Sequence, residues 1–238
     1  MRWYRIATDQ NDPAGENNLG WMYQNGYGIA RDDAEAMRWY RKAANQGYAA
    51  AQDNVGWLYQ KGLGVAQDYA EALRWYRMAA SQGYATAENN VGYMYQHGWG
   101  VAQDYAQAME WYRKAADQGY ADAQNNVGFL YGSGLGVPLD YKEAMRWYRK
   151  AADQAYATAQ DNVGYLYQNG LGVAQDYKEA MRWYRKAADQ GYAAAQSNLG
   201  MLYDRGLGVP RDPVQARYWM EKAARNGDDA ARKWLTNH

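Results

Sequence analysis

The chain has 238 residues, with 26 Lys and Arg, 26 Asp and Glu, no Cys and a formal net charge of zero. The neutral balance argues against a nucleic-acid partner, whose phosphates attract a concentrated basic surface. The absence of Cys excludes disulfides, a zinc cluster and a thiol nucleophile, and no apolar run approaches the roughly 20 residues that span a membrane.

Aromatic residues and glycines recur along the whole chain at a step of 36 residues. The tryptophans in register are Trp3, Trp39, Trp75, Trp111, Trp147, Trp183 and Trp219, and the glycines in register are Gly20, Gly56, Gly92, Gly128, Gly164 and Gly200. No insertion breaks this register. A fixed period of this length predicts an array of stacked supersecondary units.

The first helix of each repeat, helix A, is illustrated by Ala50–Gly62. Ala51, Val55 and Leu58 fall on one helical face. Gly62 ends the helix, because glycine readily takes the left-handed conformation. Gly56 lies inside the helix at a cost of about 0.5–1 kcal/mol, which we interpret as close approach of the second helix's backbone.

The second helix, helix B, is predicted from about Tyr69 to Gln82. Asp68 caps its N-terminus, and Glu71 is placed to bond back as in a capping box. Gly83 stops the helix, and the same glycine recurs in most copies. Ala155 replaces it once, so we expect Ala155 to be strained in a left-handed conformation.

The register divides the chain into partial and complete repeats. Residues 1–13 form a partial repeat, a remnant of helix B. Six repeats follow at 14–49, 50–85, 86–121, 122–157, 158–193 and 194–229, and residues 230–238 form a C-terminal capping helix. The residue before helix A is Tyr in five copies but Asp12 at the start and Asp228 at the end, where Asp is the better cap.

The blocks Ala51–Val65 and Asp68–Gly83, repeated along the chain, resemble the Sel1-like repeat family, a relative of the tetratricopeptide repeat. The resemblance implies an all-α fold, a right-handed α/α superhelical solenoid of helix-turn-helix repeats, and an adaptor role in bacterial protein complexes. One cysteine-rich branch of the family is linked to β-lactam binding or hydrolysis, but its repeats carry disulfides that this chain lacks. The start, Met1–Arg5, has no signal-peptide pattern and falls mid-repeat, so cytoplasm, periplasm and secretion all stay open.

The residues that could carry chemistry fit structural roles better. Gly132–Gly136 lacks the lysine of a phosphate loop and occupies a turn after a helix. His97 and His238 are the only histidines, so neither a metal site nor a catalytic triad is predicted. An arginine column on helix B, Arg38, Arg74, Arg146 and Arg182, reads better as a salt-bridged face than as an anion site. We therefore predict no catalytic residue, metal or cofactor.

Three columns of helix A share one stripe at spacing i, i+3, i+7 and form the candidate binding surface. They are an asparagine column (Asn18, Asn54, Asn90, Asn126, Asn162 and Asn198), an aromatic column (Trp21, Trp57, Tyr93, Phe129 and Tyr165, with Met201 last), and a variable column (Asn25, Lys61, His97, Ser133, Asn169 and Arg205). Asn is a poor helix former. Either each Asn caps or bridges a neighbouring backbone, or the column faces a bound chain.

The leading functional hypothesis is a non-catalytic scaffold that binds a peptide or a partner protein on its concave, helix-A side. One alternative is a small-molecule-binding or hydrolase-like repeat protein. A second alternative is a designed array without a natural ligand, which the lack of insertions suits but the variable column does not.

Overall fold

Paired helices fill the computed structural model, which describes residues 11–238; these residues form thirteen helices and no strand. The first helices of the repeats are α2 (Pro13–Asn25), α4 (Ala49–Lys61), α6 (Ala85–His97), α8 (Ala121–Ser133), α10 (Ala157–Asn169) and α12 (Ala193–Arg205). The second helices are α3 (Asp33–Asn45), α5 (Tyr69–Ala80), α7 (Tyr105–Asp117), α9 (Tyr141–Ala152), α11 (Tyr177–Asp189) and α13 (Pro213–Arg225), and α14 (Asp229–Asn237) follows. The predicted all-α repeat fold is confirmed. The predicted helix B remnant lies in residues 1–13, of which 1–10 are outside the described residues.

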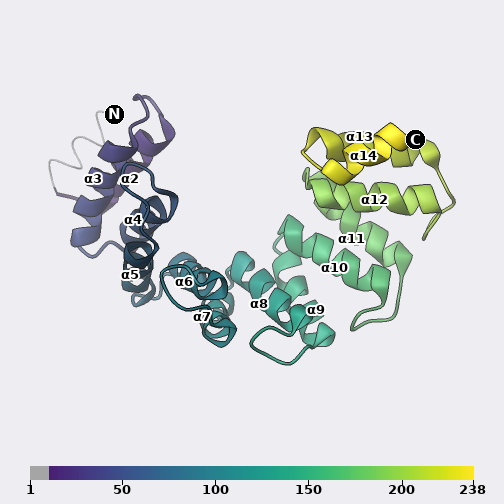
Figure 1. Ribbon diagram of the computed structural model, residues 1–238, viewed down its shortest axis with the longest axis horizontal. Helices are drawn as coiled ribbons and strands as arrows, with labels where there is room; N and C mark the ends of the chain where they lie inside the picture. The colour runs from purple at the N-terminus through teal and green to yellow at the C-terminus, as the bar shows by residue number, and fades with distance from the viewer. Residues whose placement is uncertain (1–10) are drawn as a thin grey trace. The chain divides into compact units, whose positions relative to one another are not determined.

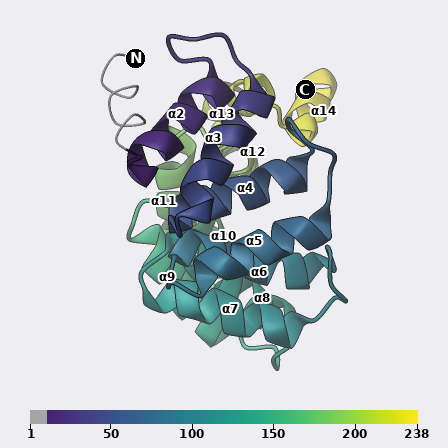
Figure 2. The same cartoon turned by 90° about the vertical axis from the view of Figure 1, so that its left-hand side faces the viewer.

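The chain divides into two compact units, Met1–Gln118 and Gly119–His238. In each unit, every helix A packs against its own helix B and against helix B of the preceding repeat in that unit (Figure 1). Figure 2 shows this stacking for α3 to α7 of the first unit. Helix A is therefore enclosed on most sides, and only a narrow stripe of it faces solvent.

A tyrosine ring packs directly onto the glycine inside helix A. A Cβ added to Gly56 would lie 2.8 Å from Cδ1 of Tyr76, and a Cβ on Gly92 would lie 2.7 Å from Cδ1 of Tyr112. The glycine is needed, but the obstacle is mainly this ring, and the interpretation from close backbone approach was incomplete. A Cβ on Gly56 would also lie 3.1 Å from the carbonyl oxygen of Ala72, and a Cβ on Gly200 would lie 3.2 Å from that of Ala216 and 3.2 Å from Met220, which replaces the tyrosine in the last repeat.

The hydroxyl of the same tyrosine reaches back to helix A. Tyr76 Oη donates to Gln60 Oε1 at 2.6 Å, and Tyr112 donates to Gln96 at 2.8 Å. Burial raises the pKa of both phenols, so they stay protonated donors. In the fourth repeat Gly132 replaces this glutamine, and the Tyr148 hydroxyl would lie 3.8 Å from a Cβ at that position.

A second set of polar contacts joins three of the repeats to the one before, through Gln52, Gln160 and Gln196. Gln82 Nε2 donates to Gln52 Oε1 at 2.8 Å, and Gln52 Nε2 donates to the carbonyl oxygen of Ala44 in the preceding helix B at 3.2 Å. Gln190, Gln160 and Ala152 repeat this arrangement in the second unit. Because Gln52 and Gln160 are buried, these bonds satisfy amides that would otherwise destabilise the fold.

Helix ends follow the sequence prediction with one exception. The Asp68 carboxylate accepts hydrogen bonds from the backbone N–H groups of Ala70 and Glu71, and Asp12 and Asp228 cap α2 and α14 in a similar way. The predicted return bond from Glu71 was wrong. The Asp68 N–H donates to the carbonyl oxygen of Tyr59 at 3.1 Å, and the Glu71 carboxylate pairs with Arg74.

We predict that Ala155→Gly stabilises the protein by about 1 kcal/mol. Ala155 has φ +62°, the left-handed region in which its Cβ is strained, as expected from the sequence. The measurement is the free energy of unfolding by denaturant titration. The matched control is Gly191→Ala, one repeat later at φ +87°, which should lose a similar amount. Unchanged or lower stability of Ala155→Gly would refute the strain.

We also predict that Gly132→Gln stabilises the protein by about 1–2 kcal/mol, because it improves helix propensity and supplies an acceptor for Tyr148. A Cβ at Gly132 makes only an ordinary contact, 3.5 Å from Cβ of Ala144. Gly132→Ala isolates the propensity part and should yield about half of the gain. If the two variants have equal unfolding free energies, the hydroxyl-to-glutamine bond contributes nothing.

Candidate functional site

The solvent-facing stripe of helix A consists of the three predicted columns, and we call it the helix-A face. In α4, Trp57 and Asn54 are half-buried and Lys61 is exposed, whereas Val55 and Leu58 beside them are fully buried. The first unit carries the stripe on α2, α4 and α6, and the second carries it on α8, α10 and α12. On each first helix, the structure therefore places the asparagine, the aromatic residue and the variable residue along one partly exposed stripe.

Asparagines of the stripe bridge neighbouring repeats. Asn54 Nδ2 donates to Asn17 Oδ1, Asn90 to Asp53, Asn162 to Asn125 and Asn198 to Asp161, each over 2.8–2.9 Å and each 37 residues back. The bridging interpretation of these four residues is confirmed, although the acceptor is a side chain and not the backbone. Asn18 is exposed, and Asn126 is half-buried.

Two of the acceptors in these bridges are carboxylates. Asp53 is 8% exposed, and burial raises its pKa to about 6, although the bond from Asn90 opposes the rise. Burial likewise raises the pKa of Asp161 to about 6, against the bond from Asn198. Asn17 and Asn125 accept the equivalent bonds without a charge.

The aromatic column is the most exposed apolar feature of the stripe. Trp21 is 49% exposed, Phe129 40% and Tyr165 51%, and Tyr93 is also exposed. These rings lie beside the core without entering it, because Leu58 and its equivalents fill the buried position next to them. Aromatic area held in place on a rigid helix is well suited to binding a partner.

Two aromatic residues of the turns join this surface and were missed by the column analysis. Tyr27 stacks on Trp21 with ring centroids 4.9 Å apart, and Trp99 lies 5.3 Å from Tyr93 and 5.2 Å from His97. Both replace the leucine that occupies this turn position in the other repeats, as in Leu63. That departure from the column was the available signal.

The variable column is exposed in every copy. Asn25 and Asn169 bond the carbonyl oxygens of Trp21 and Tyr165, one turn back on their own helices. Burial lowers the pKa of His97, which contacts Tyr93 at 4.1 Å between ring centroids. Lys61 and Arg205 project charge from the same position.

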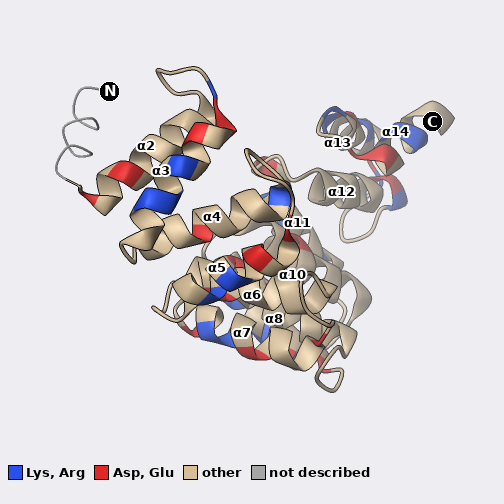
Figure 3. Ribbon diagram, turned by 60° about the vertical axis from the view of Figure 1, so that its left-hand side comes forward, with Lys and Arg blue, Asp and Glu red and all other residues tan. Residues whose placement is uncertain are grey.

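Charges elsewhere are interspersed along the helices of each unit (Figure 3). The predicted salt-bridged face of helix B is confirmed: Arg38, Arg74, Arg146 and Arg182 pair with Glu35, Glu71, Glu143 and Glu179 one turn earlier. Within residues 11–238, no group of three or more His, Asp or Glu side chains is placed to hold a metal ion. None of the helices in this described region is long and apolar enough to cross a bilayer.

Comparison with known proteins agrees with this geometry. The family model described as "Sel1 repeat" matches six consecutive segments, residues 13–48, 49–84, 85–120, 121–156, 157–192 and 193–228. The chain belongs to the Sel1 repeat family. The matched segments begin one residue before the ranges given by the sequence register. No curated protein matches the chain.

Solved structures of bacterial Sel1 repeat proteins resemble the chain closely. It is 38% identical to c5321, a protective antigen of uropathogenic Escherichia coli strains displaying an SLR fold, with a TM-score of 0.84 over all of this chain and 51% of that one. It is 37% identical to a Sel1 repeat protein from Oxalobacter formigenes, with a TM-score of 0.84, covering 90% of this chain and 86% of that one. The immunity protein PA5088 from Pseudomonas aeruginosa shares the fold at 20% identity and a TM-score of 0.64, over 90% and 82% of the two chains. The chain thus spans about half the length of the E. coli protein.

Sel1 repeat proteins are generally protein-interaction scaffolds and typically lack enzymatic activity. Membership in the family therefore favours a binding surface over a catalytic centre. In this chain, the helix-A face carries exposed aromatic side chains at one recurring position, namely Trp21, Tyr93, Phe129 and Tyr165.

We predict that Asp53→Asn stabilises this Sel1 repeat protein at pH 7 by about 1–3 kcal/mol. Because the folded pKa of Asp53 is raised above its ordinary 3.8 to about 6, the folded state binds the proton more tightly. The contribution of Asp53 to stability is then fully present below pH 4 and is lost as the pH rises through 6. Asparagine keeps the acceptor for Asn90 and carries no charge.

The measurement is the unfolding free energy of both proteins at several pH values between 4 and 7. The advantage of Asp53→Asn should vanish near pH 4, where the wild-type carboxyl is protonated. Asp117→Asn, at an exposed position of the same unit, is the control and should change little. A gain that is independent of pH would contradict the assignment to Asp53 ionisation.

Proposed function

We propose that this chain is a non-catalytic protein-interaction scaffold that binds an extended peptide or a partner protein's surface on its helix-A face. The observation that carries the proposal is the row of exposed aromatic side chains on successive first helices. Trp21 and Tyr93 are exposed in the first unit, with the half-buried Trp57 between them, and Phe129 and Tyr165 are exposed in the second.

Energetics favour these rings as the main anchors. Large aromatic side chains give apolar contact area at a small loss of conformational entropy, and they are over-represented among the residues that dominate binding energy. Isolated apolar residues are normal on surfaces, whereas a contiguous exposed row points to a partner. Tyr27 and Trp99 enlarge the row in the first unit.

The other two columns support different parts of the proposal. The asparagine column holds adjacent helices together through bridges such as Asn90 to Asp53, and so fixes the spacing of the aromatic residues three positions later. Its amides are half-buried at Asn54 and Asn90, so a bound chain would meet only their outer edges. The variable column, with Lys61, His97 and Arg205, would then distinguish one partner from another.

We predict that Trp57→Ala combined with Tyr93→Ala weakens partner binding by about tenfold or more, which corresponds to about 1.4 kcal/mol. The partner is first captured with the wild-type chain from a lysate of the source organism, and its Kd is then measured by titration calorimetry. Circular dichroism checks that the variant keeps its helices.

The matched control is Met78→Ala, because Met78 is 37% exposed on helix B of the same unit, away from the helix-A face. This control should bind like the wild type. Unchanged affinity of the double variant, or an equal loss in Met78→Ala, would show that the partner binds another surface.

A further inference from the structure

A pocket of about 560 Å³ opens on the second unit between α11, α12 and the turn that follows α12. Its apolar lining includes Met181 and Leu199, which are buried, and Tyr203 and Val209, which are half-buried. None of these residues belongs to the helix-A face, so the pocket is a separate surface. Its volume is within the range of pockets that hold ligands or large side chains.

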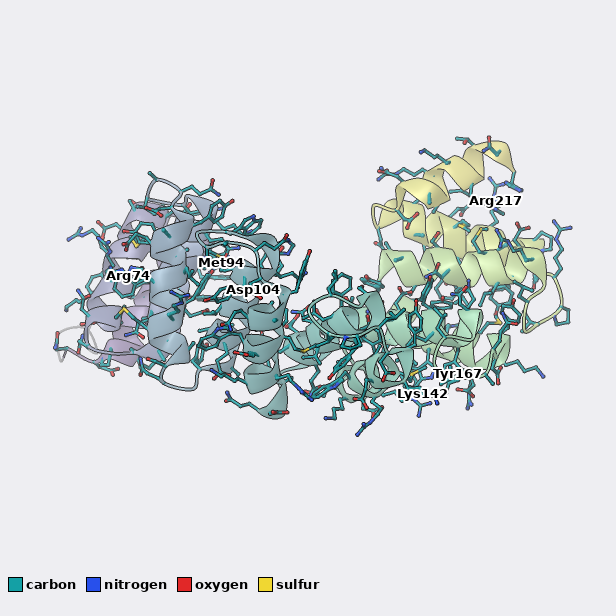
Figure 4. The ribbon with its side chains drawn as sticks, turned by 60° about the horizontal axis from the view of Figure 1, so that its bottom comes forward. Arg74, Met94, Asp104, Lys142, Tyr167 and Arg217 are labelled. Carbon is teal, nitrogen blue, oxygen red and sulfur yellow. The ribbon has the colours of Figure 1, made fainter. Side chains whose placement is uncertain are left out.

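The pocket lies where an arginine that bonds a tyrosine of the next repeat elsewhere makes other contacts. Arg77 donates to the hydroxyl of Tyr95 at 2.6 Å, and Arg41 and Arg149 donate to Tyr59 and Tyr167 in the same way. Figure 4 labels Tyr167, the acceptor one repeat before Tyr203.

Arg185 is the equivalent donor for Tyr203 but makes other contacts. Its Nε pairs with Asp189 at 3.1 Å, and its guanidinium lies over the Trp219 ring at 4.8 Å. Among the described residues, no donor replaces it at the Tyr203 hydroxyl, which lines the open pocket. The pocket thus combines an apolar floor with a tyrosine that lacks the arginine bond of its counterparts.

Cations line one side of this floor, and all of them lie on α11. Lys178, Arg182, Arg185 and Lys186 all line the pocket and are exposed, and no Asp or Glu lines it. Arg182 and Arg185 are balanced by Glu179 and Asp189. Lys178 and Lys186 form no ion pair with any residue in the described region, although Lys186 lies 3.8 Å over the Trp183 ring. The pocket rim therefore carries positive charge in excess.

We propose that this pocket is a second interaction site, which binds an acidic segment of a partner protein by enclosing one bulky apolar side chain while aspartates or glutamates on both sides of it meet the cationic rim. The floor explains the need for an apolar side chain, and the four cations spaced along α11 beside it explain the need for more than one carboxylate. Charge complementarity of this kind raises specificity and association rate.

The test uses the full chain and a fluorescein-labelled peptide in which a central Phe-Leu pair is flanked on both sides by aspartates and glutamates, with binding measured by fluorescence anisotropy. One control peptide replaces the Phe-Leu pair by Ser-Gly, and a second replaces the acids by their amides. We expect both control peptides to bind at least about tenfold more weakly. Equal binding of the Ser-Gly peptide would mean attraction by charge alone and would overturn the proposal, as would failure of the parent peptide to bind.

Charge reversal on the chain locates the site. Lys178→Glu combined with Lys186→Glu should weaken binding of the parent peptide by about tenfold or more. Lys142→Glu combined with Lys150→Glu changes the same positions one repeat earlier, where Arg149 bonds Tyr167, and should have little effect (Figure 4). Equal losses in the two pairs would overturn the proposal.

Lys178→Glu alone tests the site without disturbing the contact between Lys186 and Trp183, and it should still weaken binding severalfold. The outcome is also separable from the proposed scaffold function. Trp57→Ala with Tyr93→Ala alters the helix-A face of the other unit and should leave peptide binding at this pocket unchanged; a loss there would place the peptide on the helix-A face.

Discussion

The contact between a tyrosine ring of helix B and a glycine backbone of helix A sets the spacing on which the other contacts in a repeat depend. With the ring of Tyr76 against Gly56, its hydroxyl lies within 2.6 Å of Gln60. Small residues such as Ala72 and Ala79 are fully buried on the same helix B. Any side chain at the glycine would separate the helices and break the polar bond together with the packing.

Because helix A is enclosed by two second helices, some of its polar residues pair across repeats. Gln52 and Asn54 do this on either side of the buried Val55, one toward the preceding helix B and one toward the preceding helix A. Amides suit this position because each carries both a donor and an acceptor. Either asparagine or aspartate can accept the bond from the bridging asparagine. Where the acceptor is an aspartate, the bridge depends on pH.

The fold was predictable from the sequence because its determinants are local and recur in every copy. Each of these determinants can be recognised from one repeat position compared along the chain. Examples are the helix-capping aspartates, the glycines that end helix A and the strained Ala155. The exposed stripe also followed from helical spacing. The partner of Asn90 could not be predicted in this way. Its acceptor, Asp53, lies 37 residues earlier, and this offset depends on how adjacent first helices stack and not on the sequence of one repeat. The pocket at Tyr203 could not be predicted for a similar reason. Arg185 occupies the same position in its repeat as Arg149, and the two differ only in the neighbouring side chain that each contacts.

The bridges and polar contacts described above join a repeat only to itself or to its immediate neighbour. Gln82 to Gln52, Gln52 to Ala44 and Asn90 to Asp53 would be remade if a whole repeat were duplicated or lost by recombination, because the new neighbour would offer the same glutamine, alanine and amide-type acceptor. Length is consequently free to evolve in steps of one repeat without rebuilding a core. The binding surface lengthens or shortens in the same steps, and one aromatic position and one variable position are gained or lost each time.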